Sequence, residues 1–188
     1  CALPIFAHFP PLDAVGVAGD SRVMTPEEMD EQLPSIFQAL AHCGAPVVHY
    51  KVCSTFDSAP GIGSIGRAME IAQKIFNNDV IPIVGSTPAL QRYCLFGHLF
   101  ARAGTDGKMY RIDRHPIMSV HPVTPIDDSD LVVHLKRQAA LSIARIDFPQ
   151  IEPGLDARHD ALVAVEGRHR TPNQVCGASR VTSRGLVR

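Results

Sequence analysis

The sequence predicts an α/β domain with a parallel, Rossmann-like sheet and an additional hairpin and loop region. The prediction depends on residues 14–84, where short apolar runs alternate with helical patterns in the order strand, helix, strand, helix, strand. This order is typical of parallel sheets whose strands are joined by right-handed crossovers. A length of 188 residues, with 45% hydrophobic and 20% charged residues, suits one globular domain.

The first strand is predicted over 14–18, where every residue is small or apolar, and a helix follows it. Thr25 can cap this helix, Pro26 suits its first position, and Glu28 completes a capping box. Apolar residues then recur at helical spacing until Gly44, which closes the helix.

A second strand is predicted over 46–51 and a third over 80–84, with an amphipathic helix over 64–76 between them. Pro82 places the third strand at an edge or makes it irregular, because proline cannot donate to a strand ladder. A polar loop with three glycines, residues 51–66, leads from the second strand into the second helix.

The chain changes character after residue 90. The remaining predicted elements are a hairpin with strands at 93–102 and 108–112, a proline-rich loop at 113–125, a helix at 127–138 and a strand near 142–146. We therefore assign residues 1–150 to the α/β domain and residues 151–188 to an irregular tail.

The totals exclude several classes of protein. A net charge of −1 and a pI of about 6.8 give no basic excess for binding nucleic acid or a membrane surface. No apolar run approaches the ~20 residues that span a bilayer, and no secretory signal pattern is visible. The five cysteines are widely spaced and form no CxxC pair, which favours a reducing cytoplasm and argues against a metal site.

Ligands of parallel α/β sheets bind beyond the C-terminal ends of the strands. This rule gathers residues 20–22, 51–66 and 85–87 at one edge. Arg22 and Lys51 there suit a carboxylate or phosphate, with ordinary surface cations as the alternative. Four further side chains suit the hydroxyls of a polyol, with turn and cap chemistry as the alternative: Ser54, Thr55, Asp57 and Ser58.

The three glycines of the loop resemble a phosphate cradle, but the Gly-Lys-Ser/Thr ending of a P-loop is missing. Cys53 would need a base such as His49 or His115 to act as a nucleophile, and a buried structural cysteine is the favoured alternative. In the proline-rich loop, Arg114 and His115 are interpreted as lining a polar site together with His121. Stiffening of that loop is the alternative.

Several motifs in the right order resemble the N-terminal domain of the four-carbon acid sugar kinases, over about residues 12–147. The motifs lie at 16–22, 49–58, 92–97, 113–116 and 121–125. The resemblance implies a carbohydrate kinase that transfers the γ-phosphate of ATP, with Mg, to a sugar acid such as threonate or 3-oxo-tetronate. It further implies that Arg22 and the segment Lys51, Val52, Cys53 and Ser54 contact the sugar acid.

The chain departs from this family at both ends. The family's acidic Asp-Asp-x-Thr-Gly-Ala motif on the first strand is not found, and no ATP-binding C-terminal domain is recognised. We therefore expect a truncated chain that supplies the sugar-acid site and is inactive alone. A non-catalytic sugar-acid or anion-binding module is the alternative. A missing strand exposes a sheet edge, which pairing into a homodimer would cover.

Overall fold

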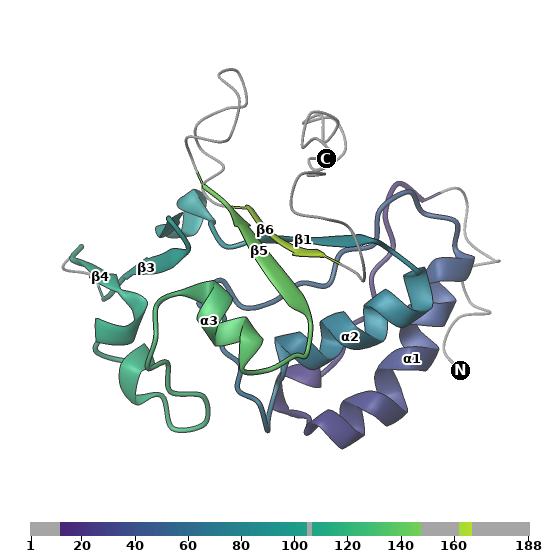
Figure 1. Ribbon diagram of the computed structural model, residues 1–188, viewed down its shortest axis with the longest axis horizontal. Coiled ribbons are helices and arrows are strands. Elements are labelled where there is room, and N and C mark those ends of the chain that lie inside the picture. Colours follow the sequence, from purple (N-terminus) through teal and green to yellow (C-terminus); the bar gives the residue numbers. More distant parts are fainter. Residues whose placement is uncertain (1–11, 105–106, 148–161, 167–188) are drawn as a thin grey trace, which may run out of the picture.

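A computed structural model of the chain describes residues 12–104, 107–147 and 162–166 (Figure 1). Within these residues the strands form two three-stranded sheets, with the strand orders β1-β6-β5 and β2-β3-β4. Helices α1 and α2 pack against each other, and α3 packs against β5 and α2 (Figure 1). The α/β class of the prediction is therefore confirmed.

Helices α1 (Pro26–His42) and α2 (Ile65–Phe76) begin where their capping residues predict. Thr25 forms the predicted capping box, because its Oγ1 accepts the Glu28 amide at 3.3 Å and its own amide donates to Glu28 Oε2 at 2.8 Å. Ser64 caps α2 by accepting the Arg67 amide at 3.0 Å. Their facing sides form a core cluster that includes Met29, Leu33, Phe37, Ala68 and Ile71.

The first sheet joins β1 (Val80–Val84), β6 (Leu162–Glu166) and β5 (Ser142–Ile146), with β6 in the middle. Both pairings are antiparallel, and Pro82 lies on the edge strand β1, as its missing N–H requires. Strand β6 falls in residues 151–188, for which the sequence predicts an irregular tail. At these five residues the structure has a paired strand instead. The rest of that segment lies outside the described residues.

The second sheet consists of β2 (Arg92–Leu95), β3 (His98–Arg102) and β4 (Met109–Arg111). The run predicted as one strand over 93–102 is itself a hairpin. Its turn residues Phe96 and Gly97 both have positive φ, 50° and 81°, which suits a tight two-residue turn. The second half of this run pairs with β4, which corresponds to the predicted hairpin at 93–112.

Helix α3 (Leu131–Lys136) is shorter than the predicted helix over 127–138. Asp130 is the reason, because its carboxylate accepts the amide of Val132 at 2.8 Å and so caps the helix at this point. The strand expected near 142–146 is present as β5.

The parallel, Rossmann-like sheet is not confirmed. All strand pairs in the described residues are antiparallel, and the segments 14–18 and 46–51 form no strand. Val47 is 55% exposed, whereas strands of parallel sheets are covered on both faces. An apolar run becomes a buried parallel strand only when neighbouring strands flank it, and the described residues supply none there.

Candidate functional site

The loop that follows residue 50 is fastened to the short 3-10 turn η2 (Ser21–Val23). Ser21 Oγ lies 2.7 Å from the hydroxyl of Tyr50, and the Gly63 amide donates to the Met24 carbonyl at 2.8 Å. Gly63 has φ +58°, and a Cβ there would lie 2.3 Å from the Arg22 carbonyl oxygen. Two of the three segments predicted to meet are therefore in contact.

The third predicted segment, 85–87, packs on other parts of the molecule. Gly85 lies against Leu131 and Cys94, and Ser86 Oγ donates to the Arg92 carbonyl at 3.1 Å. These contacts join the segment to β2 and α3.

Arg22 and Asp57 form the charged centre of the site. The Arg22 guanidinium is paired with Asp57 Oδ2. The Arg22 side chain is 61% exposed and the Asp57 side chain only 3% exposed. The other carboxylate oxygen, Asp57 Oδ1, is buried and has no hydrogen-bond partner among the described residues. The pair thus offers an exposed cation, which suits a ligand with an anionic group, and holds beneath it a buried acceptor that has no partner among the described residues.

The segment between Lys51 and Thr55 lies beside this pair in the sequence. Lys51 is exposed, and Val52, Cys53 and Ser54 are half-buried. Cys53 Sγ lies 3.0 Å from Thr55 Oγ1, so this thiol has a hydroxyl partner rather than a histidine base in the described contacts. Burial raises the pKa of Tyr50 just before the segment, and the hydrogen bond with Ser21 opposes this shift.

The sequence predicts that Ser58 faces substrate hydroxyls, but in the structure Ser58 lies in the interior and is only 1% exposed. Its Oγ donates to the Phe56 carbonyl and lies 2.9 Å from both His134 Nε2 and Gln138 Nε2. With these partners the hydroxyl is used by the fold. Sequence periodicity places His134 on the inner face of its helix, but the contact with Ser58 spans 76 residues and has no local signal.

Arg114 and His115 lie at the turn η4 (Ile112–Arg114). Arg114 is exposed and pairs with Asp113 at 3.7 Å, whereas His115 is buried. The His115 Nδ1 accepts the amides of Ile117 and Met118, each at 3.2 Å. His121 similarly accepts the Thr124 amide at 3.1 Å. The contacts of both histidines favour the loop-stiffening interpretation.

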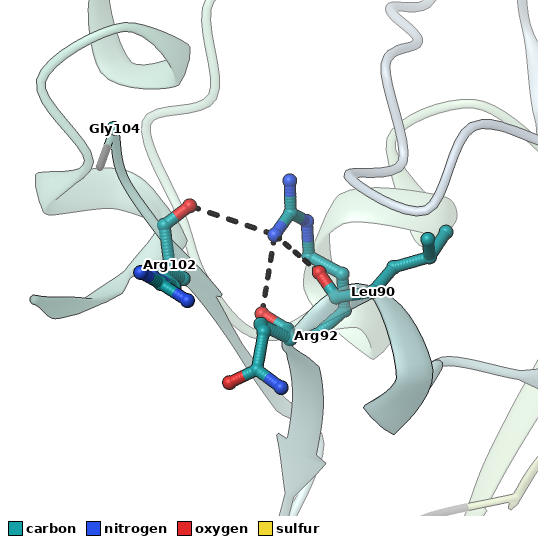
Figure 2. Close-up of a pocket in the computed structure, with 5 residues that line it drawn as sticks. Leu90, Arg92, Arg102 and Gly104 are labelled. Carbon is teal, nitrogen blue, oxygen red and sulfur yellow. Dashed lines mark hydrogen bonds between the residues drawn. The ribbon is translucent and has the colours of Figure 1, made fainter. Parts of the chain in front are cut away.

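A pocket of about 530 Å³ lies at the far end of the β2–β3 hairpin (Figure 2). It is lined by Leu90, Gln91, Arg92, Arg102 and Gly104. The Arg92 Nη1 donates to three carbonyls there, those of Leu90 at 2.8 Å, Gln91 at 3.1 Å and Arg102 at 3.5 Å (Figure 2). Arg92 therefore ties the hairpin ends together, and the pocket contains none of the predicted site residues.

The glycine loop does not fit the phosphates of a nucleotide. The first amides of α2 already have partners: Gly66 donates to Gln138 Oε1 at 3.3 Å, Arg67 to Ser64 Oγ at 3.0 Å and Ala68 to the Ser64 carbonyl at 3.2 Å. A Cβ at Gly66 would lie 2.6 Å from the Gln138 backbone, so this glycine serves close packing.

The described residues contain no group of three or more His, Cys, Asp or Glu side chains arranged to hold a metal ion. Among the same residues, no helix combines the length and the apolar character needed to cross a membrane.

Comparison with known proteins finds a family match and curated relatives. The sequence model described as "Sugar-binding N-terminal domain" matches residues 4–178. The 3-oxo-isoapionate kinase of Paraburkholderia graminis is 48% identical over 147 residues, which are 78% of this chain and 31% of that protein. The 3-oxo-tetronate kinase of Pseudomonas fluorescens is 28% identical, over 83% of this chain and 34% of that protein. This chain thus spans about a third of the length of these relatives.

A crystal structure of a Haemophilus influenzae protein is also similar, with a TM-score of 0.54 and 26% sequence identity. The similarity covers 70% of this chain and 32% of that one. The family match includes Arg22 and the whole loop from Lys51 to Ser64, whose contacts form the site described above. The chain belongs to the family of sugar-binding N-terminal domains found in sugar-acid kinases.

Proposed function

We propose that this chain supplies the sugar-acid site of an ATP-dependent kinase that phosphorylates four-carbon sugar acids of the threonate or 3-oxo-tetronate type. The names of the relatives support this class, since two of them are kinases of 3-oxo sugar acids. The 48%-identical relative is named for 3-oxo-isoapionate, so the substrate class extends to that acid as well.

The observation that carries the proposal is the pairing of Arg22 with Asp57. An exposed guanidinium can bind the carboxylate of a sugar acid through two N–H groups, and Lys51 adds a second cation in the adjoining segment. The unpartnered Asp57 Oδ1 is buried in the ligand-free chain, and it accepts one sugar hydroxyl when ligand binding uncovers it. A carboxylate and a hydroxyl a few bonds apart are what a small polyhydroxy acid presents.

ATP and Mg enter the proposal through the kinase names of the relatives. Because the start of α2 has its amides occupied, we assign nucleotide binding to parts of the protein outside the described residues. The described domain then binds and orients the sugar acid, and we expect no phosphoryl transfer by this chain alone.

A thermal-shift titration of the chain with threonate, 3-oxo-tetronate, threitol and ATP tests the proposal. The two acids should raise the melting temperature, because a ligand at 100 times its Kd stabilises by about 2.7 kcal/mol. Threitol has comparable hydroxyls but no carboxylate, and ATP has no site in the described domain, so neither should do so. Equal stabilisation by threitol, or stabilisation by ATP alone, would contradict the proposal.

A non-catalytic sugar-acid or anion-binding module is the second candidate function. Its support is the exposed Arg22 guanidinium, which can bind an anion whether or not a phosphoryl group is then transferred. Both functions predict binding of threonate, so the discriminating measurement is phosphorylation of threonate by the product of the complete gene. Turnover supports the kinase, and tight binding without turnover supports the module.

We further propose a homodimer in the cytoplasm. The apolar runs at 14–18 and 46–51 have no strand partner in the described residues, and a second copy would let them pair in a sheet. Cys43 and Cys53 are free thiols, which suits a reducing compartment. Sedimentation analysis tests the dimer, and Val47→Lys should shift it to monomer, whereas Val133→Lys on α3 should not.

A further inference from the structure

A buried polar cluster connects α3 to the loop of residues 51–66, which carries the proposed sugar-acid site. It consists of Ser58, His134 and Gln138, which are 1%, 6% and 9% exposed. Ser58 Oγ, His134 Nε2 and Gln138 Nε2 lie 2.9 Å from one another in all three pairings. Groups this deeply buried need satisfied hydrogen bonds, so the cluster has a defined proton arrangement.

The positions of the protons in the cluster follow from two backbone groups beside it, the Gly66 amide and the Phe56 carbonyl. Gln138 Oε1 accepts the Gly66 amide, which turns the Gln138 NH₂ group toward the cluster. Its two protons then go to Ser58 Oγ and His134 Nε2, while Ser58 donates its own proton to the Phe56 carbonyl. His134 Nε2 is therefore an acceptor, and the neutral imidazole carries its proton on Nδ1.

The cluster acts on a strained part of the loop. Phe56 has φ +55° although it is bulky, and its side chain is only 1% exposed. Such a conformation persists where the surroundings hold it. The cluster fixes the Phe56 carbonyl on one side of Asp57 and the Ser58 side chain on the other.

We propose that His134 and Gln138 are positioning residues for the sugar-acid site, holding the backbone of residues 56–58 so that Asp57 meets Arg22. This inference rests on the proposed function for its ligand. The loop is held only while His134 Nε2 accepts a hydrogen bond from the Gln138 amide, so protonation of His134 releases the loop. A proton on Nε2 would face the donor group of Gln138, and turning that amide would break its bond with Gly66.

The groups around His134 determine the pH at which it is protonated. Burial lowers the pKa of the imidazole, and the hydrogen bond with the Phe56 backbone opposes this shift. The nearby Arg137 also lowers the pKa, while Asp127 and Asp128 raise it. On the loop and α2, the carboxylates of Asp57 and Glu70 are paired with arginines. The neutral form therefore persists below the ordinary histidine pKa of about 6.5, and the loop should loosen as the pH falls through the lowered pKa of His134.

Three variants test the proposal. His134→Leu removes the acceptor, and His134→Gln restores an acceptor oxygen without an imidazole. His98→Gln is the matched control, because the His98 ring also bonds a serine, Ser129 at 2.9 Å, which lies just before the start of α3 and not in the buried cluster. Two measurements are made on each: hydrogen exchange of amides 53–58 without ligand, and calorimetric titration of threonate between about pH 5.5 and 8.

We expect His134→Leu to speed exchange of the loop amides and to weaken threonate binding, each by about tenfold, with the amides of α1 unchanged. His134→Gln should resemble the wild type at neutral pH and lose the decline in affinity at acid pH, which His98→Gln should keep. Unchanged loop exchange in His134→Leu would overturn the proposal, as would acceleration spread over the whole chain or failure of His134→Gln to rescue. If the loop responds as expected but the wild type binds no sugar acid, the positioning stands and the proposed function fails.

Discussion

Asp57 is a buried carboxylate with one oxygen paired to an exposed arginine and the other without a partner in the described residues. Loss of Arg22 would leave the negative charge of Asp57 buried without a counter-ion, and a buried unpaired charge destabilises the fold. In the proposed function, this second oxygen accepts a hydroxyl of the sugar acid.

Arg22→Gln should therefore weaken both the fold and the site. We expect a loss of about 1–3 kcal/mol in the free energy of unfolding, since a hydrogen bond to a charged group is removed. Threonate affinity should fall by at least about tenfold. Urea denaturation and calorimetry measure the two effects. Arg22→Lys is the control, because it keeps the positive charge and loses the guanidinium. If Arg22→Gln binds threonate as tightly as the wild type does, Arg22 does not contact the ligand.

Gly63 is required by the contact between η2 and the loop. Gly63→Ala places a Cβ 2.3 Å from the Arg22 carbonyl oxygen at φ +58°, so the backbone must move. A left-handed conformation alone costs about 1–2 kcal/mol for a residue with a Cβ, and the clash adds to this. Gly61→Ala is the matched control, because nothing lies within 4 Å of its Cβ position and it should change stability by less than ~0.5 kcal/mol. If the two variants are equally stable in urea denaturation, the close approach of Gly63 to the Arg22 carbonyl is not present in solution.

At the scale of elements, helices α1 and α2 could be predicted from the sequence because their boundaries depend on neighbouring residues. The Thr25 capping box and the Ser64 cap are signals within three residues of the helix start. The strands could not be predicted as well, since β1 pairs with β6 about 80 residues later and no local pattern contains that partner. The same holds for the site. The sequence predicts that the segments of Arg22 and Asp57 meet, as they do. The burial of Ser58 depends on the distant His134 and Gln138, which no local pattern indicates.

The cap of α1 is open to a direct test. Thr25→Ala removes the acceptor for the Glu28 amide and should lower the free energy of unfolding by about 1 kcal/mol. Thr25→Ser keeps the acceptor oxygen and should lose only a fraction of that. Threonate affinity should not change in either variant, because α1 lies outside the proposed site. An alanine variant as stable as the wild type in urea would show that the cap does not contribute.

At the scale of the whole molecule, stability should decrease with acid in two separate pH ranges. His134 is more weakly protonated in the folded than in the unfolded chain, because burial lowers its pKa. Stability from this group is complete above the unfolded value of about 6.5 and is lost as the pH falls through the folded pKa. Asp30 and Asp113 also have lowered pKa values, owing to hydrogen bonds from Arg67 and Arg111, and their contribution is lost only below the ordinary aspartate value of 3.8.

The two ranges can be separated by urea denaturation of the ligand-free chain at a series of pH values. The wild type should lose stability first below about pH 6.5 and again in the range of the carboxylates. His134→Gln should abolish the first loss and leave the second, because Gln does not titrate. Asp113→Asn should keep the loss of stability near neutral pH and reduce the loss in the range of the carboxylates. A wild-type curve that is flat between about pH 5 and 7 would show that the buried cluster does not couple His134 to folding, since a buried neutral histidine must produce a slope there.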